Sequence, residues 1–122
     1  MGPFETDSIL MSVKKLLNVD FDDPAFDMDI LMLINNEFMT LHQLGVGPEA
    51  GFSVTDVSTG WNDYSDDATL LETVKVYVYL RVRMLFDPPA SSVVADAINS
   101  RISELEWRLN VQAERNYNTG DG

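Results

Sequence analysis

The stretch LLETVKVYVYLRVRMLFDPP, Leu70–Pro89, decides the fold of this chain. Its apolar residues are almost continuous. A row at helical spacing runs through it, formed by Leu70, Val74, Tyr77 or Val78, Arg81 and Leu85. The part VKVYVYLRV also alternates and is rich in β-branched residues, as a strand would be. Its length, the polar SDD before it and the two prolines after it favour one helix from about 67 to 86.

A second long helix follows at once. After the turn FDPPA it begins with Ser91 or Ser92 as N-cap, and it ends near Glu114. Apolar residues three or four positions apart form its buried seam: Val94, Ile98, Ile102, Leu105 and Leu109. We expect residues 115–122, RNYNTGDG, to be a flexible tail.

The first helix of the chain is expected to have Thr6 or Asp7 as its N-cap and to run to Leu17. Lys14 and its neighbour Lys15 lie in the last turn, where the helix dipole favours cations. Asn18 suits the left-handed position that ends many helices.

The next helix has an unusually wide apolar surface. It begins at Asp23-Pro24, a sound pair for an N-cap and first turn, or else at Asp27, and it runs to Leu44 before Gly45. Such a surface indicates either a deeply buried helix or a face reserved for a partner. The residues that widen it include Met28, Met32 and Met39.

Residues 45–65 are the least helical part, because four glycines and Pro48 interrupt any helix. Phe52 and Val54 indicate short extended pieces that could form a small β-hairpin. Trp61 and Tyr64 are expected to fix the end of this loop to the core.

The sequence of 122 residues as a whole predicts an all-α fold of about four helices, with one domain at 1–114 and a tail at 115–122.

The formal charge is −12 and is unevenly distributed. Residues 1–70 hold 13 acidic and 2 basic residues, whereas residues 71–122 hold 7 and 6. Binding to nucleic acid depends largely on cations that release counterions from phosphate, so a conventional DNA-binding role is not expected. The acidity could serve solubility, a basic partner, or a surface that DNA passes without adhering.

No catalytic, cofactor-binding or metal site is predicted. The acidic run from Asp20 to Asp29 lacks the glycine and the glutamate that a calcium-binding EF-hand loop needs. GVGPEAG (45–51) lacks the Lys-Ser/Thr of a phosphate-binding loop. His42 is the only histidine and there are no cysteines, so a zinc site has no ligand set. No signal peptide or membrane span is indicated, and a soluble intracellular protein is expected.

Four strings together resemble the small head–tail connector, or adaptor, proteins of tailed bacteriophages and prophages. They are SVKKLLNV (12–19), FMTLHQLGVGPEAGF (38–52), VKVYVYLRVRMLFDPP (74–89) and ELEWRLNV (104–111). The resemblance covers about residues 8–112 and implies a structural protein without catalysis or cofactors. Its subunits would form a ring, dodecameric in the virion neck, that extends the DNA channel beneath the portal protein and receives the stopper or tail-completion protein.

The resemblance also implies that the first three helices form the body of the ring, and that the last helix with Val111–Gly122 reaches the portal. Assembly would take place in the host cytoplasm. Arg81 and Arg83 either reach out to water or pair with nearby acids, or they make salt bridges to another subunit or a partner. The candidate contact residues are Met28, Met32, Met39, Arg81, Arg83 and Trp107, and the candidate channel-facing acids are Asp20, Asp22, Asp23 and Asp27.

Three other functions fit parts of the pattern. A small acidic inhibitor that mimics DNA would use the negative charge against a basic protein. A generic helical interaction module would use the wide apolar faces, and an enzyme would need a carboxylate pair that no motif marks. The long loop and the surplus apolar surface favour the connector over the mimic, which needs neither.

Overall fold

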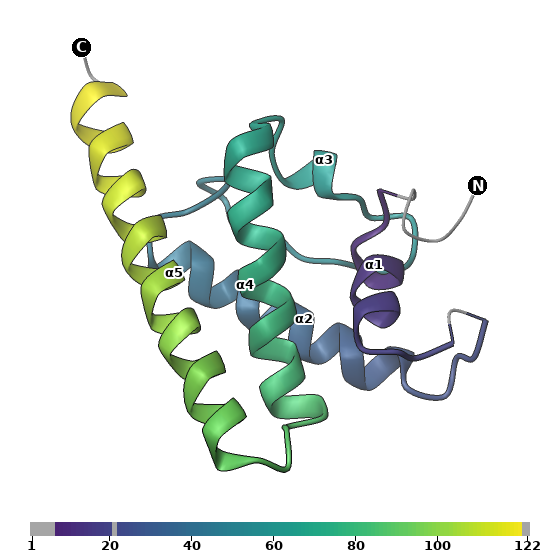
Figure 1. Cartoon of the computed structure of the whole chain (residues 1–122). Coiled ribbons are helices and arrows are strands. Elements are labelled where there is room, and N and C mark those ends of the chain that lie inside the picture. Colours follow the sequence, from purple (N-terminus) through teal and green to yellow (C-terminus); the bar gives the residue numbers. More distant parts are fainter. Residues whose placement is uncertain (1–6, 21, 121–122) are drawn as a thin grey trace.

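A computed structural model describes residues 7–20 and 22–120, with side chains through residue 115. These residues form an all-α fold: α1 (Ile9–Leu16), α2 (Asp27–Gln43), α3 (Trp61–Tyr64), α4 (Ala68–Phe86) and α5 (Ser92–Gly120). Helix α4 lies at the centre, with α5 along one side and α1 toward the other, and α2 crosses behind (Figure 1). The all-α prediction is therefore confirmed.

Helix α4 confirms the helical interpretation of the deciding stretch. The Asp67 side chain caps it by accepting hydrogen bonds from the backbone N–H groups of Thr69 and Leu70, at 3.1 and 3.2 Å. Leu71, Val74, Tyr77, Val78 and Val82 are buried along it. Because α2 and α5 both pack against α4, apolar residues are needed on more than one side, and this explains its narrow polar face.

Helix α5 begins as predicted but ends later. Ser91 precedes it, and its hydroxyl accepts a bond from the backbone N–H of Val94 at 3.4 Å. Ile102, Leu105 and Leu109 of the predicted seam are buried, whereas Val94 at its start is exposed. The predicted end near Glu114 is wrong, because the helix continues through Gly120.

Helix α1 differs from the prediction at its start. Ser8 is the N-cap, and its hydroxyl accepts a bond from the backbone N–H of Met11 at 3.2 Å. Asp7 instead serves α3, since its carboxylate accepts from the N–H of Asn62 and its carbonyl from that of Trp61. The alternative cap, Thr6, lies outside the described residues. Asn18 has the expected left-handed conformation, with φ 63°.

Helix α2 begins at Asp27, the second of the two predicted starts, and ends at Gln43. The Asp23-Pro24 pair forms a turn instead, in which the Asp23 carboxylate accepts from the N–H of Ala25 at 3.0 Å. The Lys14 ammonium group donates to the Asp23 carbonyl at 2.8 Å and to the Asp27 carboxylate at 2.7 Å. Lys14 therefore holds this turn against α1.

The predicted β-hairpin at 45–65 is wrong. The only β pairing among the described residues is an isolated bridge between Ser8 and Gly60. The extended piece at Val54 is held by a side chain: the Asn35 amide donates to its carbonyl at 3.0 Å and accepts from its N–H at 2.6 Å. As predicted, Trp61 and Tyr64 are buried, and both rings pack on Phe38. No helix within the described part is apolar and long enough to cross a bilayer.

Candidate interaction surfaces

The outward side of α2 carries the methionines. Met28, Met32 and Met39 expose 73%, 67% and 61% of their surface. With about 3.6 residues per turn, these positions form one stripe on the side opposite the buried Ile30 and Ile34. This methionine stripe is apolar surface that the described chain leaves uncovered, and methionines adapt well to a binding partner.

A shallow hollow lies where α2 begins and α4 ends. Its volume is about 350 Å³. The Phe26 and Phe86 rings meet edge to face at 5.5 Å between their centres, and they form an aromatic wall. We call this the α2–α4 hollow, and it is lined by Phe26, Asp29, Met32, Leu33, Leu85 and Phe86. Asp29 is its one charged residue, and Met32 joins it to the methionine stripe.

The outward side of α5 carries an exposed tryptophan. Trp107 exposes 67% of its surface, on the side of the helix away from Leu105 and Leu109. Arg108 follows Trp107 directly in the chain and Arg101 lies between one and two turns before it, and each forms an ion pair with Glu104. We call Trp107, Arg101 and Arg108 the α5 outer face.

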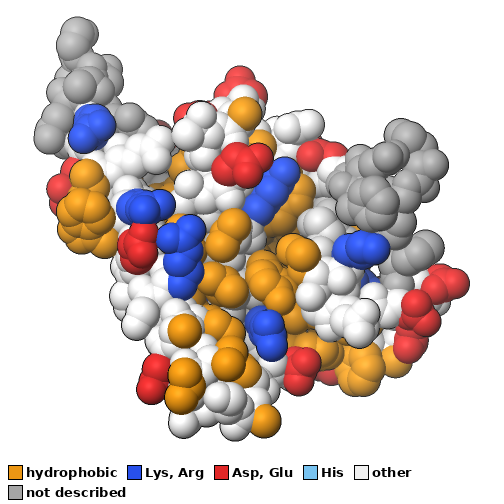
Figure 2. Space-filling model, in the orientation of Figure 1, with side chains coloured by type: hydrophobic (Ala, Val, Ile, Leu, Met, Phe, Trp, Pro, Cys, Tyr) orange, Lys and Arg blue, Asp and Glu red, His pale blue; other side chains and the backbone are white. Residues whose placement is uncertain are grey.

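The α5 outer face and the α2–α4 hollow lie on opposite flanks of the molecule. Helix α5 forms one flank, and the start of α2 lies with α1 at the other (Figure 1). Residues 16–74 contain no Lys or Arg, so every basic residue belongs to α1, α4 or α5. Figure 2 shows Lys and Arg side chains spread over these helices, with hydrophobic side chains exposed between them.

The two arginines of α4 have partners within the chain. The Arg81 guanidinium donates from Nε to the Glu37 carboxylate at 2.7 Å, and Glu37 is fully buried. This hydrogen bond raises the pKa of Arg81. Arg83 donates to the Tyr79 hydroxyl at 3.5 Å and is half-buried. Of the alternatives that the sequence left open for Arg81, pairing with an acid of the same chain is therefore the correct one. Neither arginine extends freely from α4.

The predicted channel-facing acids divide into two groups. Asp20, Asp22 and Asp23 are exposed in the segment between α1 and α2. Asp27 is different, because its carboxylate lies 2.7 Å from the Lys14 ammonium group and is only partly exposed. Asp27 thus acts as a structural partner of Lys14, and the free negative charge of this segment comes from the other three.

The sequence model of the phage connector protein family matches residues 9–116. The chain belongs to the phage connector protein family. Searches of curated proteins and of solved structures found no significant match. The matched range contains both surfaces of this connector protein, the α5 outer face and the α2–α4 hollow.

The family is one of structural proteins rather than enzymes. Within the described part of the connector, no three His, Cys, Asp or Glu side chains lie close enough together to hold a metal ion. His42 is exposed on α2, and its ring Nε2 lies 3.0 Å from the Glu49 carbonyl oxygen. The surfaces of this connector are therefore its candidate functional sites.

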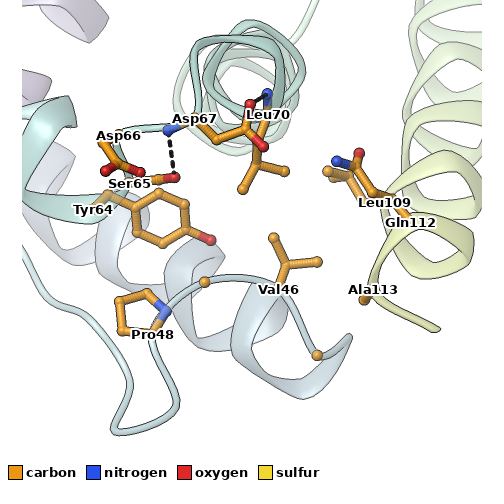
Figure 3. Close-up of a pocket in the computed structure, with 12 residues that line it drawn as sticks. Val46, Pro48, Tyr64, Ser65, Asp66, Asp67, Leu70, Leu109, Gln112 and Ala113 are labelled. Carbon is orange, nitrogen blue, oxygen red and sulfur yellow. Dashed lines mark hydrogen bonds between the residues drawn. The ribbon is translucent and has the colours of Figure 1, made fainter. Parts of the chain in front are cut away.

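A larger hollow of about 600 Å³ lies between the loop after α2, the start of α4 and α5. Figure 3 shows Tyr64 on one side of it, facing Val46 and Leu70, with Leu109 and Ala113 of α5 opposite. The Tyr64 hydroxyl is buried without a hydrogen-bond partner among the described residues, and burial raises its pKa to about 12. Gly47 covers this hydroxyl, since a Cβ atom there would lie 2.5 Å from its oxygen.

Two buried ionisable residues were missed by the sequence analysis. Lys14 and Glu37 are both fully buried, on the core sides of α1 and α2. Their positions were a usable signal, because Lys14 follows Leu10 by four residues and Glu37 follows Ile34 by three. A charged residue within an apolar row predicts a buried ion pair, but the row does not name the partner.

Proposed function

We propose that this protein is a structural head–tail connector subunit of a tailed phage, which assembles as a ring in the virion neck. Membership of the phage connector protein family over residues 9–116 is the observation that carries the proposal. The exposed methionine stripe and Trp107 support it, because they are apolar surfaces without a partner in the single chain. The ring would place the protein between the portal and the stopper or tail-completion protein.

A closed ring needs two different surfaces on each subunit, so that the same contact repeats around the axis. The α5 outer face and the α2–α4 hollow meet this requirement, because they lie on opposite flanks. The C-terminal part of helix α5 also extends beyond the start of α4 in Figure 1. This extension supports the proposal that the last part of the chain, 111–122, reaches the portal.

The channel would be lined in part by Asp20, Asp22 and Asp23, which are exposed and lie within four residues of the chain. Carboxylates offer no cations to replace the counterions of DNA, so a lumen lined by them would let DNA pass without adhering. Asp27 contributes less to such a surface because Lys14 balances its charge.

Deletion of the gene from the phage that carries it tests the proposal. We expect electron microscopy of the lysate to show heads and tails that are not joined, because the connecting ring is missing. Complementation with the wild-type gene should restore tailed virions. Complementation with Asp20→Asn/Asp22→Asn/Asp23→Asn should restore joining as well, but it should change the retention or ejection of DNA.

Two results would contradict parts of this proposal. Normal tailed virions in the deletion lysate would exclude the connector function. If the triple variant restores joining with unchanged DNA retention and ejection, the acids do not line the channel. The charge of −12 favours one alternative, a DNA-mimic inhibitor, and that function predicts normal virions together with tight binding to a basic protein.

A further inference from the structure

The hollow of about 600 Å³ beside Tyr64 contains a hydrogen-bond donor that nothing in the described chain satisfies. Tyr64 exposes only 5% of its surface, and its hydroxyl has no partner there. Burial raises the pKa of this hydroxyl to about 12, so it keeps its proton and remains a donor at neutral pH. Buried polar groups are nearly always hydrogen-bonded, so this donor at the wall of a hollow indicates a missing acceptor. We call this space the Tyr64 hollow.

The walls of the Tyr64 hollow suit an aliphatic side chain with a peptide group next to it. Figure 3 shows Val46 and Leu70 near the hydroxyl, with Leu109 of α5 opposite. Gln112 of α5 also lines the hollow, and no hydrogen bond joins its side-chain amide to the described residues. Because an amide both donates and accepts, Tyr64 and Gln112 together match the C=O and N–H of a main chain. The volume lies within the range of about 300–1,000 Å³ that ligand pockets have.

Backbone alone covers the hydroxyl at Gly47. A Cβ atom at Gly47 would lie 2.5 Å from the Tyr64 oxygen, so the main chain passes directly over it. Within the described residues, no hydrogen bond holds the N–H or the C=O of Gly47. The loop is anchored just before it, where the Val46 N–H donates to the Leu41 carbonyl at 2.9 Å. Gly47 can therefore shift outward without breaking a hydrogen bond, and this shift brings the hydroxyl within reach of an acceptor.

Charge indicates a basic partner. The two charged residues that line the Tyr64 hollow, Asp66 and Asp67, are both acidic and exposed. The acidic residues within two positions of the lining residues outnumber the basic ones: Glu49, Asp63, Asp66, Asp67, Glu72 and Glu114 against Arg108 and Arg115. Arg108 is moreover paired with Glu104. A carboxylate would be repelled here, whereas a neutral carbonyl flanked by Lys or Arg is attracted.

A second copy of the chain has no suitable segment to offer. All its Lys and Arg residues lie on α1, α4 or α5. The main-chain carbonyls of a helix accept hydrogen bonds within that helix, so they do not supply an extended peptide group. The occupant is therefore expected to come from a different protein.

We propose that the Tyr64 hollow binds an extended basic segment of another neck protein. An aliphatic side chain of this segment enters between Val46 and Leu109, and the adjacent carbonyl accepts a hydrogen bond from the Tyr64 hydroxyl. Lys or Arg residues beside that side chain then face Asp66 and Asp67. The proposal rests on the connector function proposed above, and it gives the chemistry of one partner contact.

Photo-cross-linking in assembled virions tests this site. The photoreactive amino acid p-benzoylphenylalanine replaces Gln112 in one variant and Asp66 in another, so that the reporters lie on two sides of the hollow. The matched control carries it at Ser103, an exposed position of α5 that does not line the hollow. After irradiation, mass spectrometry identifies the attached peptides. We expect both reporters, but not the control, to join the same segment of another neck protein, with an aliphatic residue and Lys or Arg beside it.

A synthetic peptide with the cross-linked sequence then measures what each group contributes. Asp66→Lys should weaken binding of this peptide to the connector about 10-fold at low salt, because a rim charge is reversed. Asp87→Lys is the matched control, since Asp87 is exposed at the other end of α4 and should leave binding unchanged.

Tyr64→Phe separates binding from folding. It should weaken binding of the peptide about fivefold, because one hydrogen bond is lost. It should also raise the melting temperature, because the unpaired buried hydroxyl is removed while the packing of the ring is kept. A merely structural role of the hydroxyl predicts the reverse, a lower melting temperature with unchanged binding.

The possible failures can be told apart. Particles that contain the connector but give no more cross-link at either reporter than at Ser103 would overturn the site and leave the connector function intact. Cross-links to a second copy of the chain, or to a segment without Lys or Arg, would overturn the proposed partner. Absence of the protein from particles would overturn the connector function and this contact with it.

Discussion

Replacing Arg81 by methionine is expected to lower the free energy of unfolding by about 3–5 kcal/mol. The Glu37 carboxylate is fully buried and receives a hydrogen bond from Arg81 Nε at 2.7 Å. Its remaining contact is with the Asn36 amide at 3.2 Å, a neutral donor. Arg81→Met therefore leaves a buried charge without its cation. Urea denaturation followed by circular dichroism measures the loss.

Arg83→Met is the matched control, because Arg83 is on the same helix, is half-buried and bonds to the neutral Tyr79 hydroxyl. It should cost no more than about 1 kcal/mol. The double variant Glu37→Met/Arg81→Met removes both charges and should recover most of the stability lost in the single variant. Equal losses for Arg81→Met and Arg83→Met would show that the buried pair does not stabilise the fold.

Gly47→Ala is expected to cost more than about 3 kcal/mol of stability. Gly47 has φ +92°, in the left-handed region where a side chain is strained. A Cβ atom there would also lie 2.5–2.7 Å from three atoms of the Tyr64 ring and hydroxyl, so the buried ring would have to move. Thermal and urea unfolding of the variant measure the cost.

Gly45→Ala separates the two causes. Gly45 has a similar φ of +85°, but its nearest neighbour would be the Ala113 Cβ at 3.5 Å, which is ordinary contact. It should cost only the backbone strain, about 1–2 kcal/mol. In a Tyr64→Leu background the cost of Gly47→Ala should fall to that of Gly45→Ala. An unchanged difference between the two glycines in that background would exclude the clash with Tyr64.

The main helices could be predicted because their signals are local. Asp67 caps α4 and the two prolines follow its end, so the alternation of VKVYVYLRV did not decide the outcome. That alternation has a tertiary cause, since α4 packs against α2 on one side and α5 on another. The pattern alone could not show which elements cover which side.

The errors occur where a distant contact replaced a local one. Extended residues near Val54 suggested a hairpin, but the Asn35 side chain of α2 takes the hydrogen bonds that a second strand would have made. Asp23-Pro24 suited a helix start, but Lys14 of α1 binds the Asp23 carbonyl in a turn. Asp7 caps α3, which is more than fifty residues away in the sequence.

The candidate surfaces were only partly predictable. Surplus methionines on α2 indicated either burial or a partner face, and only the structure shows that Met28, Met32 and Met39 are exposed. The sequence also could not identify the partner of Arg81, because Glu37 lies 44 positions earlier in the chain. The α2–α4 hollow combines residues of two helices and has no signal in either helix alone.

A cryo-electron microscopy reconstruction of the neck in intact virions tests the central claim most directly. The account predicts a closed ring of this fold between head and tail, in which α5 of each subunit lies against the start of α2 in the next. It also predicts that the segment with Asp20, Asp22 and Asp23 faces the channel. A neck without this protein, or one that holds it only in two-fold pairs, would contradict the account.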